Sequence, residues 1–325
     1  MHFKTPLRLL KRWFLLYREV FLDGRRFLTA VPFYGVEKGN EDAYLEGAII
    51  RQYHVVEKGL AMPEFRPGFG VSTVRALIKD LEKWKQLGLE LNEQFAAGQA
   101  VLRAYRDHHA RIGFDLEGLF DGVDLEGGCH SGAGGAKEFR PLTADFREAF
   151  EHVCRSSASV RTFDPEKIPN REQILEAIAL ASRAPSVCNR QTARAHVYTG
   201  PVIQELLKFQ NGNRGFGHRV PLLFVVTSDL RLFTGVDERY QAWIDGGMFA
   251  MLLLLALHAQ GLGAVALNWS VKNRSDVALR KAGDIPSHER IIMLIGCGYP
   301  EEGALVPVSQ RRPAEKMVRF HGEIS

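Results

Sequence analysis

The pattern of apolar and polar positions predicts a mainly helical first part, followed by alternating helices and strands. Val74, Leu77, Ile78 and Leu81 recur with the i, i+3, i+4 spacing of an amphipathic helix over 74–87. A similar spacing predicts a second helix, over residues 91–112. The run at 221–227 is apolar up to its last residue, Thr227, which is typical of a strand covered on both faces. Shorter apolar runs predict three further strands, over residues 195–198, 264–268 and 290–295.

Two further helices have clear ends. Asn170 followed by Gln173 has the spacing of a capping box, and the helix that it starts should stop before Pro185. A long apolar helix over about 240–260 should end at Gly261. Its unbroken apolar run, Met248–Leu257, is shorter than the roughly 20 residues that a bilayer span needs.

These patterns divide the chain into three zones. Residues 1–126 form a mostly helical N-terminal extension, and residues 127–139 are a Gly-rich linker. Residues 140–325 form the second domain, in which the order of helices and strands favours a sheet with helices on both faces.

Composition narrows the function classes. The 325 residues are 46% hydrophobic and 25% charged, as in an ordinary globular protein. The net charge of +4 is too small to indicate nucleic-acid binding, so no nucleic-acid partner is predicted. The four cysteines form no CxxC pair, which argues against a metal site or a disulfide framework. Every early apolar run is interrupted by a base, so we expect no secretory leader and a cytoplasmic protein.

Four segments, in this order, resemble the motifs of the FMN-dependent nitroreductase family: Ser159-Val160-Arg161-Thr162-Phe163-Asp164; Ala184-Pro185-Ser186-Val187-Cys188-Asn189-Arg190-Gln191; Asp245-Gly246-Gly247 opening the apolar helix; and Gly296-Cys297-Gly298-Tyr299-Pro300 with Arg311-Arg312-Pro313 after it. The resemblance implies an α+β fold, a nitroreductase-like three-layer α/β/α sandwich with a mixed central sheet. It also implies FMN as cofactor, NADH or NADPH as electron donor, and a homodimer. The N-terminal extension is similar to that of nitroreductase-like proteins associated with polysaccharide gene clusters.

The resemblance further implies which residues hold the phosphate. Arg311 and Arg312, helped by Arg155 and Ser157, would bind it because guanidinium groups give charge-assisted, bidentate hydrogen bonds. The family's motif has an arginine where this chain has Ser157, so Arg155 would have to reach the phosphate from two residues upstream. Arg161 is the cation that would stabilise negative charge near N1 and O2 of the reduced ring.

Amide groups would match the alternating donors and acceptors of the flavin's pyrimidine edge. A turn fixed by proline would present some of them, and two later segments would present others. Each has a structural alternative: bracing of the loop for the first set, an ordinary Asn-Gly turn for the second and a core tryptophan for the third. The predicted contacts are Pro185, Ser186, Asn189 and Gln191; Asn213 and Arg214; and Asn268 and Trp269.

Three features leave two interpretations open. The segment 51–70 is either a packing motif or a substrate lid with His54 as an acid. The basic amphipathic start, residues 6–17, packs on its own domain or a dimer partner, or lies on an anionic membrane surface. Cys188 is a small buried apolar residue or a thiol that is redox-active beside the flavin.

The expected function is that of an FMN-dependent oxidoreductase that passes hydride from NAD(P)H through the flavin to an unidentified small organic acceptor. No catalytic side chain is predicted, because the cofactor carries the chemistry. One alternative is different flavin chemistry on the same fold, of the dehydrogenase, dehalogenase or flavin-fragmenting type. The other is a non-catalytic binding or assembly protein that retains the fold.

Overall fold

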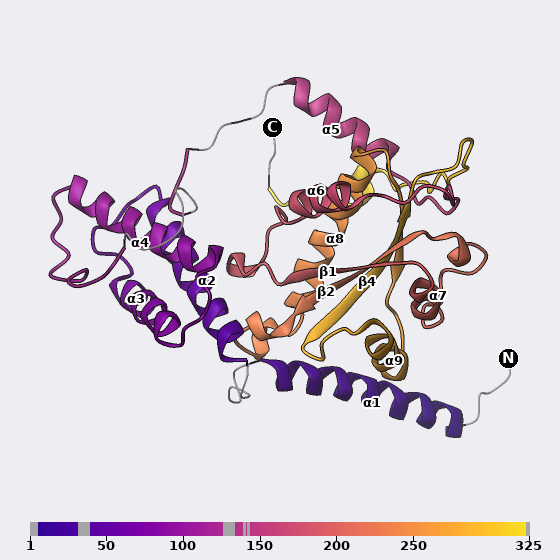
Figure 1. Ribbon diagram of the computed structural model, residues 1–325, viewed down its shortest axis with the longest axis horizontal. Coiled ribbons are helices and arrows are strands. Elements are labelled where there is room, and N and C mark those ends of the chain that lie inside the picture. Colours follow the sequence, from indigo (N-terminus) through magenta and orange to yellow (C-terminus); the bar gives the residue numbers. More distant parts are fainter. Residues whose placement is uncertain (1–5, 32–39, 126–133, 139–140, 142–143, 323–325) are drawn as a thin grey trace.

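The computed structural model describes residues 6–31, 40–125, 134–138, 141 and 144–322; of residues 6–9, 144 and 145 it describes only the backbone (Figure 1). Helices dominate the first part and a sheet with flanking helices forms the second. In chain order the elements are α1 (Pro6–Ala30), α2 (Glu41–Leu60), α3 (Val71–Gln86), α4 (Glu93–Arg111), α5 (Ala144–Ser156), α6 (Arg171–Ala181), η2 (Val187–Asn189), β1 (Ala193–Thr199), α7 (Val202–Leu207), η3 (Gly217–Arg219), β2 (Leu222–Asp229), η4 (Leu230–Leu232), η5 (Val236–Glu238), α8 (Gln241–Ala259), β3 (Gly263–Asn268), α9 (Asn273–Gly283), β4 (Glu289–Gly298) and η6 (Ala314–Lys316).

The central sheet has the strand order β1-β2-β4-β3. Every residue of β2 is buried, as its unbroken apolar run predicts for a central strand. The neighbouring strands pair antiparallel, with Phe224 opposite Ile295 between β2 and β4 and Val265 opposite Gly296 between β3 and β4. Parallel pairing within the described residues occurs at an isolated bridge between Ser159 and Ala264, so this bridge is the parallel component of the predicted mixed sheet.

Two apolar cores cover the two faces of the sheet, which gives the three layers predicted from the sequence. On one face α6 and α8 contribute Ala177, Phe249 and Leu253 to a core that includes Phe224 of β2. On the other face α7 and α9 contribute Leu206 and Leu279. The predicted capping box is present at the start of α6, where Asn170 and Gln173 bond each other's backbone.

The helix α8 is apolar all round but only half of it is covered. Phe249 and Leu253 face the core, whereas Trp243, Ile244 and Met251 are exposed. By length and composition α8 is the one described helix that could cross a membrane, with 44% of the tested window buried. Its packing against the sheet accounts for the buried half, because a core helix needs the same apolar residues.

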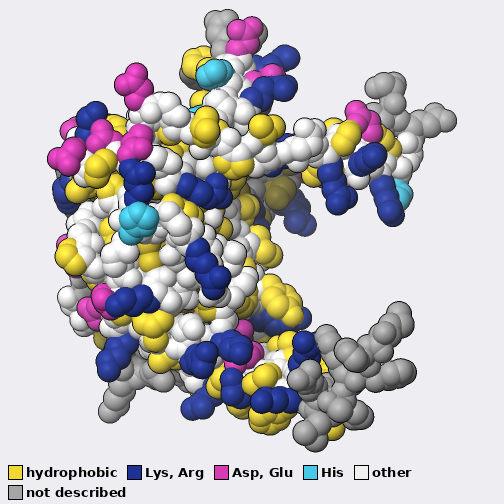
Figure 2. Space-filling view, turned by 90° about the vertical axis from the view of Figure 1, so that its right-hand side faces the viewer, with side chains coloured by type: hydrophobic (Ala, Val, Ile, Leu, Met, Phe, Trp, Pro, Cys, Tyr) yellow, Lys and Arg dark blue, Asp and Glu magenta, His cyan; other side chains and the backbone are white. Residues whose placement is uncertain are grey.

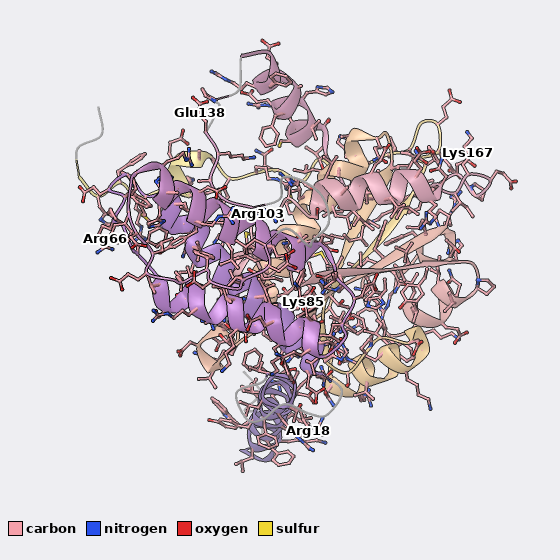
Figure 3. All side chains as sticks on the ribbon, turned by 60° about the vertical axis from the view of Figure 1, so that its left-hand side comes forward. Arg18, Arg66, Lys85, Arg103, Glu138 and Lys167 are labelled. Carbon is pink, nitrogen blue, oxygen red and sulfur yellow. The ribbon has the colours of Figure 1, made fainter. Side chains whose placement is uncertain are left out.

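The extension contains a three-helix unit, α2, α3 and α4, which Figure 3 shows in front of the sheet domain. Val56, Val74 and Val101 are fully buried where the three helices meet. Residues 112–125 complete this core, to which Leu125 belongs. This unit touches the sheet domain through α2, which packs against η2 and η4.

The segment 51–70 has the packing role that was one of its two interpretations. His54 lies 3.5 Å from Glu57, and both belong to α2. Gly68, with a left-handed φ of 72°, donates its backbone N–H to Nε2 of the fully buried His109. This bond ties the turn at Gly68 to α4. The other interpretation, a substrate lid with His54 as an acid, remains only a prediction.

The first helix is longer than its predicted core. The amphipathic pattern at residues 6–17 continues to Ala30, where Phe27 packs 6.4 Å from Phe233 of the sheet domain. The predicted linker 127–139 lies outside the described residues except for 134–138, and the domain boundaries at 126 and 140 stay a prediction.

Candidate functional site

A pocket of about 730 Å³ brings together three of the predicted phosphate ligands. Its wall is made by the end of α5, the segment 157–159, the edge strand β3, the second half of α8 and the C-terminal segment 306–311; we call it the β3 pocket. Arg155, Ser157 and Arg311 line it, although Arg311 is far from the other two in the sequence. Arg312 does not line it and is fully on the exposed side of the chain.

The segment that carries Ser157 lies directly along β3. Val160 donates its N–H to the carbonyl of Ala264 at 3.0 Å. A Cβ at Gly263 would lie 2.8 Å from that of Val160, so the second glycine of Gly261-Leu262-Gly263 permits this close approach. Gly261, with φ of 75°, forms the predicted left-handed stop of α8.

The cations of the β3 pocket are accessible to a ligand. The Arg155 side chain is 82% exposed and lies 3.6 Å from Glu151 one turn earlier. Arg311 donates to the carbonyl of Ser309 at 2.8 Å, which leaves other guanidinium N–H groups available. His258, a residue that the sequence analysis missed, also lines the pocket and shares a 2.7 Å hydrogen bond with the Ser156 hydroxyl.

One face of β3 is built from small side chains. Ala264 and Ala266 line the pocket, and Asn268 follows two residues later on the same face. Ala266 and Asn268 are exposed, so this edge strand offers a flat, open surface rather than a filled one. Such a surface suits the broad face of an aromatic ring system.

Arg161 follows the segment 157–159 in the chain. Its side chain lies against the loop that precedes β2. Its guanidinium stands 5.7 Å from the centre of the Phe216 ring, and it donates to the carbonyl of Ser159 at 3.3 Å. Gln210 of the loop donates to the carbonyl of Asn268 at 3.0 Å. The structure therefore groups Arg161, the 210–217 loop and the end of β3.

Within that group, two residues that were predicted to contact the ring make hydrogen bonds inside the protein. The Asn213 amide donates at 2.8 Å to the carbonyls of both Leu207 and Gln210, so its donors are used inside its own loop. Trp269 packs against the core, and its indole N–H donates to Asp276 at 2.9 Å. The alternatives of an ordinary turn and a core tryptophan account for both residues. Arg214 is exposed beside them.

The Pro-Ser turn borders a second, smaller pocket of about 280 Å³, lined by α6, the start of β1 and the first half of α8. Pro185, Ser186 and Gln191 line it, and we call it the turn pocket. The Ser186 hydroxyl accepts the N–H of Gln191 at 2.9 Å, and the Gln191 amide donates to the carbonyl of Asn189 at 3.2 Å. Gln191 thus braces the loop, as one of its two interpretations proposed.

The turn has an unusual backbone. Cys188, Asn189 and Gln191 all have left-handed φ values, near 48°, 55° and 48°, which non-glycine residues adopt at a cost. Asp245 holds the turn from α8 by accepting the Val187 N–H at 3.1 Å. Arg190 of the turn is fully buried. It donates to the carbonyl of Leu232 at 3.0 Å and forms an ion pair with Glu238, which anchors the turn to the residues after β2.

Asn189 does not line the turn pocket, because it faces α2 of the extension. Burial raises the pKa of Tyr53, and a hydrogen bond with Asn189 acts in the opposite direction. Tyr53 also donates to Gln94 at 2.7 Å. The extension therefore supports the turn, which residue spacing alone could not reveal.

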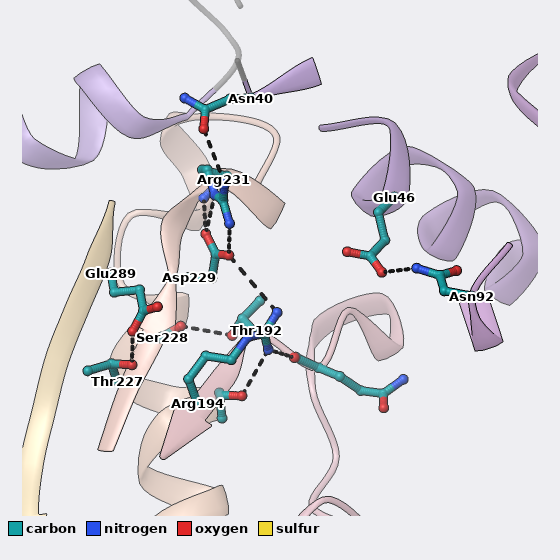
Figure 4. Close-up of polar contacts among 12 residues, drawn as sticks. Asn40, Glu46, Asn92, Thr192, Arg194, Thr227, Ser228, Asp229, Arg231 and Glu289 are labelled. Atoms are coloured by element: carbon teal, nitrogen blue, oxygen red, sulfur yellow. Dashed lines mark hydrogen bonds and ion pairs between the residues drawn. The ribbon is translucent and has the colours of Figure 1, made fainter. Parts of the chain in front are cut away.

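Figure 4 shows the polar junction between the extension and the ends of the strands. Arg231 donates to Asn40 at 3.1 Å and to Asp229 at 2.8 Å, which connects the start of α2 to β2. Burial raises the pKa of Glu46, while Arg194 of the turn pocket acts in the opposite direction. These charged groups are absent from the sequence-based site because their partners come from distant segments.

Asp245 is a titratable group that bonds directly to the turn. Burial raises its pKa above the ordinary 3.8, although bonds from Gln241 and the Val187 N–H oppose that rise. The bond from Gln241 measures 2.7 Å. Asp245 therefore acts as a structural acceptor that fixes the turn, and its place at the start of α8 is the signal by which the Asp-Gly-Gly motif could have identified it.

The fold and these two pockets define an α+β protein with a cationic, flat-walled ligand pocket beside an edge strand. The model of the nitroreductase family matches residues 155–209 and 201–299. This span contains the sheet, both glycine-containing ends of α8 and most of the predicted site. Over residues 155–299, a little under half of the chain, the protein is therefore similar to the nitroreductase family.

Two curated proteins and a solved structure illustrate what this chain is similar to. A protein named NADH dehydrogenase from Thermus thermophilus is 28% identical over 193 residues, covering 49% of this chain and 90% of that protein. A 4-nitrobenzoate reductase from a Nocardioides species is 25% identical over 236 residues, covering 56% of this chain and 94% of the other. A solved structure from Parabacteroides distasonis, described as a NADH dehydrogenase/NAD(P)H nitroreductase, has 20% identity and a TM-score of 0.47, covering 54% of this chain and 99% of that one.

Proposed function

We propose that this protein is an FMN-dependent oxidoreductase that takes electrons from NADH or NADPH and passes them to a small organic acceptor. The observation that carries the proposal is the convergence of Arg155, Ser157 and Arg311 at the β3 pocket, next to the alanine face of an edge strand. Its volume of about 730 Å³ lies within the roughly 300–1,000 Å³ range of small-molecule sites.

The side chains present fit the two ends of FMN. Arg155 and Arg311 can donate charge-assisted hydrogen bonds to a phosphate dianion, and the Ser157 hydroxyl adds a neutral donor. Arg161, near the far end of β3, places a positive charge where the ring system would lie. When bound, FMN supplies the two-electron chemistry, and the chain supplies binding, orientation and electrostatic stabilisation.

A homodimer would complete the site. The β3 pocket and the turn pocket have no lining residue in common, so one chain offers them as separate surfaces. The exposed stripe of α8, with Trp243, Ile244 and Met251, runs past both pockets and is apolar enough to be an interface. We infer that a second copy covers this stripe and brings its turn pocket towards the β3 pocket of the first.

The relatives support the donor and the acceptor class. Their names, NADH dehydrogenase and 4-nitrobenzoate reductase, describe a nicotinamide donor and a small aromatic acceptor for those proteins. We extend both to this chain as part of the proposal. A cytoplasmic location is also part of it: Cys154, Cys188 and Cys297 are free thiols among the described residues, as a reducing compartment favours.

The visible absorption spectrum of the purified protein tests the proposal. We expect flavin bands that bleach when NADH or NADPH is added without oxygen and return when 4-nitrobenzoate is added. Bands that bleach but do not return with nitroaromatic acceptors would redirect the proposal to other flavin chemistry. Protein that is colourless and takes up no added FMN would refute the proposal and favour a non-catalytic role.

A further inference from the structure

The first helix is attached to the body by its polar side. Arg26 of α1 lies 2.7 Å from Asp276, and Glu19 accepts the backbone N–H of Asn273 at 2.7 Å. Asp23 pairs with Arg290 of β4 at 2.6 Å. Ion pairs and hydrogen bonds of this kind, rather than apolar packing, hold most of α1 in place.

The apolar side of α1 consequently faces outward. Eight large apolar side chains on it are exposed, and at 3.6 residues per turn they occupy an arc of roughly 160°. Their exposed fractions run from 39% to 67%. A continuous apolar surface of this kind on a soluble domain marks an interaction site. These residues, which we call the α1 stripe, are Leu10, Trp13, Phe14, Leu16, Tyr17, Val20, Phe21 and Leu28.

The α1 stripe continues onto α8. Arg290, which binds Asp23, also lies with its guanidinium 4.8 Å from the centre of the Trp243 ring. Trp243 is 40% exposed and begins the outward stripe of α8 that includes Ile244 and Met251. The two stripes are therefore linked through Arg290, which brings α1 close to the helix that we propose as the dimer interface.

The position of this surface favours a second copy over a lipid surface, because α1 is linked to the helix that we propose as the dimer interface. In Figure 2, apolar side chains and Lys or Arg side chains lie close together at the lower edge of the molecule. Arg18 pairs with Glu19 and Arg26 with Asp276, whereas Lys11, Arg12 and Arg25 are exposed, so the choice of a second copy rests on the link to α8 and not on charge.

We propose that α1 is an arm that lays its stripe on a second copy of this chain. The inference rests on the proposed homodimer and adds to it an interface outside the family-matched residues 155–299. In the dimer the α1 stripes and the α8 stripes would form one buried surface. The extension would then help to hold together the two halves of the flavin site.

Photo-crosslinking in the full-length protein tests this contact. A benzoyl-phenylalanine replaces Phe14 or Phe21 in the stripe, and Lys11 or Thr29 on the opposite, exposed side serves as the matched control. We expect light to produce covalent dimers from the stripe positions and few from the control positions. Peptide mapping should place the crosslink on the partner's sheet domain.

The other outcomes each decide a different statement. Wild-type protein that sediments as a monomer at micromolar concentration would remove the proposed homodimer and this inference with it. A dimer that gives no crosslinks from Phe14 or Phe21 would remove only this inference. Crosslinks to lipid in anionic phosphatidylserine vesicles, with none to protein, would assign the α1 stripe to a membrane surface. That result would contradict the proposed contact with a second copy.

A pair of charge variants gives an independent measurement. Phe21→Glu should weaken dimerisation at least tenfold in sedimentation equilibrium, because it places a charge in the contact, whereas Thr29→Glu should change it less than twofold. Circular dichroism and the melting temperature verify that both variants fold. Equal dimerisation of the two folded variants would contradict the proposal.

Discussion

Replacing Arg311 separates the two arginines that the sequence could not distinguish. Arg311 lines the β3 pocket, and the adjacent Arg312 does not. A hydrogen bond to a charged group contributes roughly 1.5–3 kcal/mol. Because Arg311 is exposed, solvent screening places the expected loss for Arg311→Ala near the lower end, about 1.5 kcal/mol. That loss is about a tenfold weaker FMN affinity.

The assay is titration of flavin-free protein with FMN, followed by quenching of flavin fluorescence. Arg312→Ala is the matched control, since it removes the same charge one residue away from the pocket. Riboflavin, which lacks the phosphate, is the second control. We expect Arg311→Ala to weaken FMN binding about tenfold and riboflavin binding by less than twofold.

Three results would refute this reasoning. Equal FMN affinity in Arg311→Ala and the wild type would remove Arg311 from the phosphate site. Equal losses in Arg311→Ala and Arg312→Ala would show a general effect of net charge. Equal losses for FMN and riboflavin would place Arg311 at the ring rather than at the phosphate.

Three further changes test other parts of the structure. Ala266→Leu places a branched side chain on the open face of β3 and should reduce FMN binding more than tenfold while the melting temperature stays close to that of the wild type. Glu238→Ala leaves the fully buried Arg190 without its carboxylate and should lower the free energy of unfolding in urea by about 3 kcal/mol. Asp276 is buried, which raises its pKa, but bonds and charges from Arg280 outweigh this and hold the pKa below the ordinary 3.8. A depressed pKa means that Asp276 stabilises the fold above pH 3.8 and loses that contribution as the pH falls further, so Asp276→Asn should flatten this acid limb in a series of urea titrations.

The architecture was largely predictable because it depends on long, regular apolar patterns. The central strand β2, the helix α8 and the capping box at Asn170 all lie within a few residues of their predicted positions. Each of these three features is encoded by neighbouring residues in the sequence, so local spacing was sufficient to identify it. The pockets differ, because the β3 pocket joins residues of the family motifs that come from distant segments.

The roles of individual polar side chains were less predictable. Asn213 and Trp269 have the expected residue types in the expected segments, yet the carbonyl of Leu207 and the carboxylate of Asp276 bind their N–H groups. His258 directly follows the apolar run Met248–Leu257, and folding brings it beside Ser156. Which donors stay available to a ligand depends on where distant carbonyls and carboxylates point, and no local pattern records that.

The N-terminal extension makes contacts with the turn that no local sequence pattern predicts. By sequence it precedes the family-matched residues and contains none of the flavin motifs. In the fold α2 packs against η2, so that Tyr53 reaches Asn189 in the strained turn, while Asn40 is bonded to Arg231 beyond β2. A left-handed turn of non-glycine residues persists only when its surroundings over-determine it. The extension supplies part of that support, together with Asp245 of α8. The turn pocket is therefore a joint product of both parts of the chain, and its geometry cannot be assigned to the family domain alone.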